Sequence, residues 1–147
     1  MQFFRKSVNM KIVWSIIFAG ILISCSSSVE KAVPEETRQD SIKIKKQKEF
    51  AKQLFIDAAL LDLEGKYAEA ILEYQEALKL DPQAGIYYSL AKNYLRLNKL
   101  LPALENAKSA VEIEKNNKEY LTLLGTIYNL SRNTDSAEVI FSRIVSL

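Results

Sequence analysis

The chain of 147 residues contains no histidine and one cysteine, which excludes an internal disulfide, nucleophile systems built on histidine, and zinc sites made of histidine or several cysteines. Its four glycines and three prolines, among many alanines, leucines, glutamates and lysines, predict an all-α protein. The formal net charge of +2 comes from the N-terminus, where three basic residues and no acidic residue precede Cys25, so it does not indicate nucleic-acid binding.

The first 24 residues are typical of a secretory signal peptide. Residues 12–23 are uncharged and mostly apolar. As a helix they would reach about 18 Å, which is too short for a hydrocarbon core of about 30 Å. Basic residues before this stretch and small residues at its end complete the signal pattern. Met10, followed by Lys11, is an alternative start for it.

The sequence Leu22-Ile23-Ser24-Cys25 resembles the lipoprotein box of bacteria. The resemblance implies that a diacylglyceryl group is attached to the Cys25 sulfur and that residues 1–24 are then removed. Two or more acyl chains hold a protein stably at a membrane. Ser26 favours the outer membrane of the bacterial envelope, facing the periplasm. An uncleaved anchor and a buried free cysteine are the alternatives, and no cofactor besides the lipid is expected.

Residues 25–40 are polar, lack periodicity and contain Pro34, which predicts a flexible linker after the lipidated cysteine. Asp40 could cap a helix that starts at Ser41. The basic run Lys43–Lys48 is interpreted as a solvated helix face, with contact to anionic lipid near the anchor as the alternative.

Residues 41–147 carry a pattern that recurs at offsets of 33 and 34 residues. In each copy a small residue is followed by a second one twelve residues later, at Ala58 and Ala70, Ala91 and Ala103, and Gly125 and Ala137. This pattern resembles the tetratricopeptide repeat (TPR). The resemblance implies a right-handed α-solenoid of three helix-turn-helix units, at about 51–83, 84–117 and 118–147. Two helices approach closely only where side chains are small, and Gly65 permits a tight turn between them.

In this family the first helix of each unit lines a concave face, where ligands usually bind. Tyr88, Lys92 and Arg96, spaced i, i+4 and i+8, form one stripe on such a helix. The resemblance places the neighbouring groove positions at Lys52 and Phe55 on one side, and at Thr122, Thr126 and Asn129 on the other. The expected ligand is a peptide or protein segment with an acidic residue or a free carboxylate. An ordinary solvated helix face is the alternative.

TPR proteins that bind chaperone tails use a set of Lys, Asn and Arg residues across three repeats. The corresponding groove positions of this chain are Phe55, Ala59, Ser89, Glu119 and Leu123. Binding of chaperone tails is therefore not expected.

The last predicted helix, from Asp135 to Leu147, is more apolar than a terminal repeat helix usually is. Its apolar residues predict a surface for a second copy or a partner, made of Val139, Ile140, Ile144 and Val145. Because neither a histidine nor a glycine-rich phosphate loop is present, no catalytic activity and no metal site are expected. The predicted function is that of a membrane-anchored lipoprotein scaffold in an envelope complex; the alternative is a self-associating structural lipoprotein that dimerises through this helix.

Overall fold

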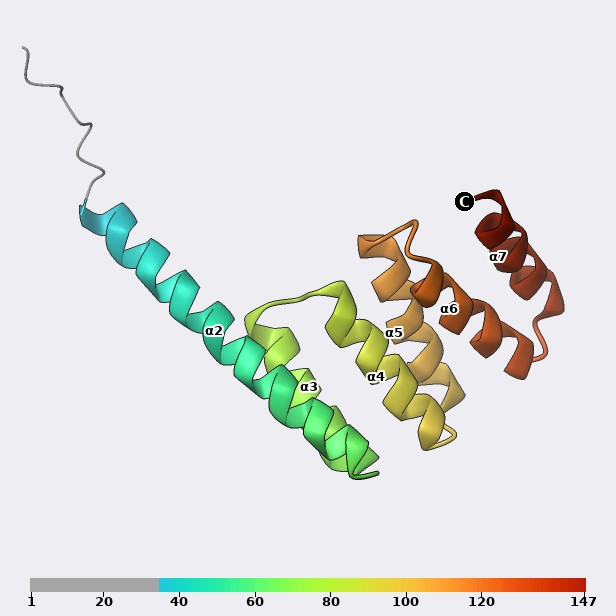
Figure 1. Ribbon diagram of the computed structural model, residues 1–147, viewed down its shortest axis with the longest axis horizontal. Helices are drawn as coiled ribbons and strands as arrows, with labels where there is room; N and C mark the ends of the chain where they lie inside the picture. Colours follow the sequence, from blue (N-terminus) through green and yellow to red (C-terminus); the bar gives the residue numbers. More distant parts are fainter. Residues whose placement is uncertain (1–34) are drawn as a thin grey trace, which may run out of the picture. The chain divides into compact units, whose positions relative to one another are not determined.

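The computed structural model of the chain describes residues 35–147, with side chains from Arg38 onward. Six α-helices follow one another in this part of the chain (Figure 1) and form the pairs α2/α3, α4/α5 and α6/α7. Their bounds are α2 Glu35–Leu63, α3 Tyr67–Leu80, α4 Ala84–Arg96, α5 Leu100–Ile113, α6 Lys118–Leu130 and α7 Thr134–Ser146. The prediction of an all-α helical-repeat solenoid is confirmed. The predicted signal peptide, Cys25 and most of the predicted linker lie outside the described residues.

The small residues of each helix pair are buried. Ala58 and Ala70 are fully buried, as are Ala91 and Ala103; Gly125 is buried, and Ala137 is 2% exposed. Larger side chains fill the space between successive pairs. Tyr74 and Leu90 belong to one buried cluster and Leu121 and Ile127 to a second, so each pair packs on the next.

The two helices of each pair are connected by the same type of turn. Gly65, Asn98 and Arg132 each adopt a positive φ, of 78°, 56° and 59°. In each turn the amide of the next residue donates to the carbonyl oxygen five residues earlier, over 2.9 Å. This bond pattern is the Schellman motif of helix C-termini. The three copies therefore share the backbone conformation of this turn, although only the first turn contains the glycine that such a conformation favours.

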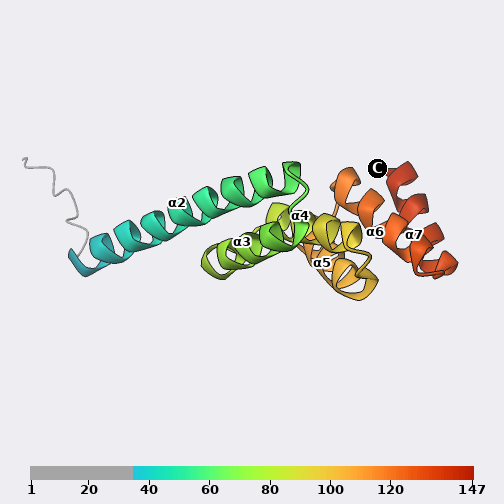
Figure 2. The same ribbon diagram turned by 90° about the horizontal axis from the view of Figure 1, so that it is seen from below.

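Helix α2 is longer than predicted, because it begins at Glu35, six residues before the expected start at Ser41. The end of the predicted linker is therefore helical. The segment from Glu35 to Leu63 contains neither glycine nor proline, so no residue in it opposes a continuous helix. The first part of α2 extends past α3 (Figures 1 and 2), and residues 38–50 are exposed at every position. Within the described residues, no helix is both long enough and apolar enough to span a membrane.

Helices α6 and α7 are in close contact at Gly125. A Cβ atom on Gly125 would lie 2.8 Å from Cζ and 2.9 Å from Cε1 of Phe141, and 3.3 Å from Cγ2 of Ile140. Real Cβ atoms do not approach carbon this closely, so the ring would have to move. Gly85 in α4 has more room, since its Cβ would meet only the Tyr120 hydroxyl at 3.7 Å.

These two glycines give a matched pair of substitutions. Gly85→Ala should raise the free energy of unfolding by about 0.5–1 kcal/mol, because alanine favours the helix. Gly125→Ala should instead lower it by about 1 kcal/mol or more, because the added methyl group overpacks the contact. Urea unfolding monitored by circular dichroism measures both values.

The ring of Phe141 supplies the control for this pair. In a Phe141→Ala background the clash is absent, so Gly125→Ala should no longer destabilise the protein. Equal stabilisation by both glycine substitutions in the wild-type background would contradict the assigned contact.

Candidate partner-binding site

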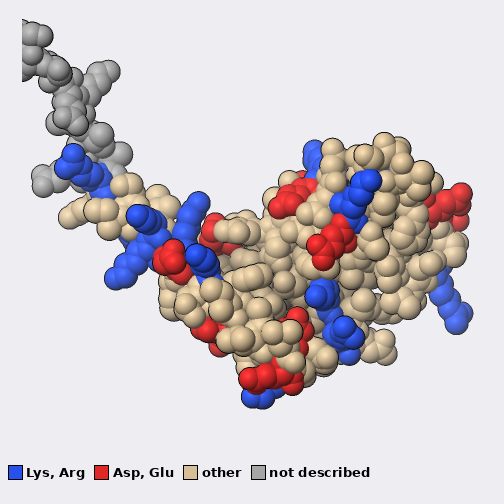
Figure 3. Space-filling view, in the orientation of Figure 1, with Lys and Arg blue, Asp and Glu red and all other residues tan. Residues whose placement is uncertain are grey.

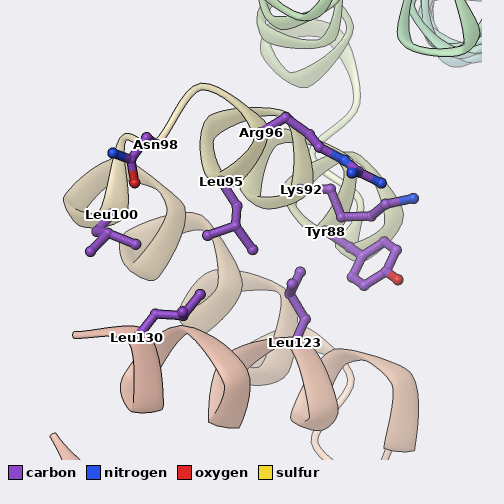
Figure 4. A pocket seen from close by; sticks show the side chains of 8 residues that line it. All are labelled: Tyr88, Lys92, Leu95, Arg96, Asn98, Leu100, Leu123 and Leu130. Atoms are coloured by element: carbon purple, nitrogen blue, oxygen red, sulfur yellow. The ribbon is translucent and has the colours of Figure 1, made fainter. Parts of the chain in front are cut away.

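Helix α4 carries the predicted stripe, and the structure brings its three side chains to one cavity of about 620 Å³. Tyr88 and Lys92 are half-buried and Arg96 is exposed. The α-helical spacing of four residues places them on one side of α4. In Figure 4 the three side chains extend together along one side of the cavity.

Four leucines line the rest of this cavity. They come from α4, from the start of α5 and from α6, and converge on the same space in Figure 4: Leu95, Leu100, Leu123 and Leu130. Asn98, in the turn between α4 and α5, completes the lining. The site thus combines an aliphatic wall with a polar and basic one. Sequence reasoning placed Leu123 in the groove but missed Leu100 and Leu130; the spacing of 123 and 130 by two helical turns was the available signal.

Tyr88 joins the two repeats at the polar end of the cavity. Its hydroxyl donates a hydrogen bond to Oε1 of Glu119 over 2.7 Å, and its ring lies 5.0 Å from the ring of Tyr120. Burial, together with the hydrogen bond to Glu119, raises the pKa of Tyr88 above the usual value of a phenol. Tyr88 therefore stays protonated at neutral pH and keeps the carboxylate of Glu119 occupied.

The two cations of the cavity lack an acidic partner among the described residues. The Nζ atom of Lys92 lies over the Tyr88 ring, 5.5 Å from its centroid. The ion pairs in this part of the chain include neither Lys92 nor Arg96. An anion that enters the cavity would therefore meet two available donors beside apolar side chains.

Three of the predicted groove residues do not line this cavity. Thr122, Thr126 and Asn129 are exposed on another side of α6. The hydroxyl of Thr122 donates to the carbonyl oxygen of Lys118 over 2.7 Å, and that of Thr126 to the carbonyl oxygen of Thr122 over 2.8 Å. The wall that α6 contributes is formed by Leu123 and Leu130 instead.

Lys52 and Phe55, the other two predicted residues, line a separate cavity of about 580 Å³. This cavity lies between α2 and α4 and includes Ile56 and Ile86. Phe55 also packs in the core, with its ring 5.4 Å from that of Tyr74. The predicted groove is thus divided between two cavities.

The predicted surface on α7 is smaller than expected. Ile140 and Ile144 pack against the second buried cluster, because they face α6 rather than solvent. Val139 and Val145 are exposed at 67% and 88%. A cavity of about 300 Å³ lies beside Val139 and Ile140, with Tyr128 of α6 on its lining.

Chemical groups for a metal site are not assembled in the described part of the chain. No three Asp, Glu or Cys side chains between residues 35 and 147 gather in a way that could hold a metal ion. The lipidation site predicted at Cys25 lies outside the described residues.

Residues 58–83 match the family model described as a tetratricopeptide repeat. The chain contains a TPR repeat. The matched segment comprises the end of α2, all of α3 and the loop before α4. A search among curated proteins finds no significant match.

Solved structures with the same fold are TPR domains. The first TPR of Spaghetti (RPAP3), bound to the HSP90 peptide SRMEEVD, has a TM-score of 0.64 at 22% identity over 67% of this chain and 79% of that one. The second TPR of the same protein, bound to the same peptide, has a TM-score of 0.67 at 21% identity over 71% and 98%. The Arabidopsis OM64 TPR domain has a TM-score of 0.65 at 22% identity over 69% and 84%. At these identities the similarity shows the TPR fold alone.

Proposed function

We propose that this chain is a non-catalytic protein-interaction module whose cavity between α4 and α6 binds a partner segment. The segment presents a carboxylate next to an aliphatic side chain. The observation that carries the proposal is the pair of cations, Lys92 and Arg96, without an acidic partner in the described residues, beside four leucines.

Each half of the cavity favours one part of such a ligand. A carboxylate that accepts hydrogen bonds from Lys92 and Arg96 gains charge-assisted bonds, which are stronger than neutral ones. An aliphatic side chain among Leu95, Leu123 and Leu130 removes apolar surface from water. Specificity follows from requiring both at once, since a purely acidic peptide leaves the leucines exposed and a purely apolar one leaves the cations unpaired.

Two of the structures with this fold hold an acidic HSP90 peptide, but we propose a different ligand here. Glu119 is an acidic residue at the edge of the cavity, where its carboxylate accepts the hydrogen bond from Tyr88. A second carboxylate of a strongly acidic tail would be repelled there. The cavity therefore favours one acidic group rather than several.

The double variant Lys92→Glu/Arg96→Glu tests this site. The protein is isolated with its partners from gently cross-linked membranes, and co-purifying proteins are quantified by mass spectrometry. The variant should recover the principal partner about tenfold less well or worse, since loss of two charge-assisted contacts costs at least about 1.4 kcal/mol.

Lys115→Glu/Arg132→Glu is the matched control, because it makes the same change in charge at exposed positions that line none of the three cavities. The control should recover the partner as the wild type does. Undiminished recovery with Lys92→Glu/Arg96→Glu would exclude the cavity as the binding site.

We further propose that a lipid on Cys25 holds the module at a bacterial envelope membrane, with residues 1–24 as a cleaved signal. The support is the sequence around Cys25, with its short apolar stretch and small Ser24. In this arrangement the chain acts as a tethered scaffold that gathers a partner at the membrane.

The variant Cys25→Ser tests the anchor. It should lose incorporation of a radiolabelled fatty acid and should not mature to the shorter chain that the wild type forms. Gel analysis with autoradiography measures both. A labelled Cys25→Ser protein, or an unlabelled wild type, would contradict lipidation at Cys25.

Self-association through α7 is a second candidate function. Phe141 and Val145 are 36% and 88% exposed, whereas Ala107 and Val111, their equivalents one repeat earlier, are 1% and 8% exposed. A second copy could cover this part of α7 as α6 covers α5.

Light scattering of the full chain in detergent, over a range of concentrations, tests this candidate. A dimer should dissociate in the variant Val145→Asp and persist in Leu63→Asp, which changes a residue of similar exposure, 85%, at the end of α2. A protein mass that stays at one copy at every concentration would exclude the dimer.

A further inference from the structure

The first part of α2, residues 38–50, is called the stem here. It stands apart from the repeats in charge. It carries five basic and two acidic residues, a net charge of +3, whereas residues 51–147 carry eleven basic and thirteen acidic residues, a net charge of −2. Figure 3 shows Lys and Arg side chains gathered on the part of α2 that extends beyond α3. The positive charge is therefore concentrated on one projecting helix.

Repulsion between like charges in the stem destabilises its helix. Lys43 and Lys46, and likewise Lys45 and Lys48, are three residues apart on the helix, where like charges destabilise it. Every residue of the stem is exposed, so its side chains gain no packing against the repeats. Among the described residues, the one ion pair that includes the stem joins Glu49 to Lys52 over 3.9 Å, with both side chains more than two-thirds exposed. A negative surface would relieve this repulsion.

Apolar side chains on the stem indicate what kind of negative surface fits. Ile42 and Phe50 are 64% and 58% exposed, and with Lys46 between them they are spaced i, i+4 and i+8, on one side of the helix. Lys43 lies beside them. Such a stripe can place its apolar side chains among acyl chains while its lysines contact anionic headgroups.

We infer that the stem of α2 lies on an anionic lipid surface, with Ile42, Lys46 and Phe50 toward the lipid. The inference rests on the proposed anchor, because Lys43 follows Cys25 by eighteen residues and so stays within about 60 Å of the lipid attachment point. Tethering raises the local concentration of the stem at the membrane. The stem then holds the repeats at a defined place on the surface, where the linker alone would leave them free to move.

A fluorescent probe on the stem tests the inference. The mature protein with Gln39→Cys is labelled with an environment-sensitive dye and reconstituted in vesicles of zwitterionic lipid, with or without phosphatidylglycerol. Gln39 lies on the same side of the helix as Ile42. The dye emission should shift to the blue in the anionic vesicles only, and high salt should reverse the shift, because salt screens exposed charges.

Two variants that lose the same number of positive charges test whether the shift depends on the stem or on the rest of the chain. Changing the stem lysines Lys43, Lys45, Lys46 and Lys48 to Gln should abolish the shift, while glutamine keeps the helix propensity of the segment. Changing Lys66, Lys79, Lys115 and Lys118 of the repeats to Gln should leave it intact. Equal emission in both kinds of vesicle, or a shift that survives in the stem variant, would overturn the inference.

Other outcomes are equally decisive. A blue shift caused by heparin or by an acidic protein, and not by anionic vesicles, would assign the stem to a soluble polyanion and overturn the lipid contact. Failure of the anchor has its own signature, because an unmodified Cys25 would take up a second dye, which mass spectrometry detects. A lipid on Cys25 without a blue shift of the dye on the stem would support the proposed anchor and contradict only the contact between the stem and the lipid surface.

Discussion

The close approach of two helices at a pair of small residues is the constraint on which the rest of the structure depends. Buried small residues recur in all three pairs, and at Gly125 even a methyl group would meet the Phe141 ring at 2.8 Å. Helices held this closely behave as one unit, so large side chains such as Tyr74 and Leu121 fill the space between pairs. The relation of α4 to α6, and hence the cavity, follows from that packing.

The chemistry of the cavity follows from how its charges are satisfied. Tyr88 donates its hydroxyl to Glu119, and Lys92 lies over the face of the same ring. One aromatic residue thus contacts both the carboxylate and the ammonium group. The wall contributed by α6 is aliphatic, so the cavity keeps a positive charge although the repeats as a whole carry a net negative charge.

The sequence predicted the fold well, because its repeated spacing of small residues resembles the TPR, and that resemblance implies the solenoid. It also predicted the stripe of Tyr88, Lys92 and Arg96, which depends on one helix alone. Thr122 and Thr126, which it assigned to the groove, do not line this cavity, since repeat register identifies equivalent positions, whereas a cavity between α4 and α6 needs different sides of the two helices. It also placed the start of α2 six residues too late, since no glycine or proline between Glu35 and Ser41 marks a boundary.

The residues at the two ends of the repeat array disfavour end-to-end stacking of a second copy of the chain. Ile71 and Leu90 share a buried cluster between the first and second pairs, as Leu104 and Leu124 do between the second and third. At the ends these positions are Glu138 on α7 and Asp57 on α2, both exposed. Stacking a second copy end to end would bring the two carboxylates together and remove them from water, which opposes that contact. Self-association through Phe141 and Val145 therefore requires α7 to meet α7 in a two-fold arrangement, in which those side chains face their counterparts and α2 takes no part.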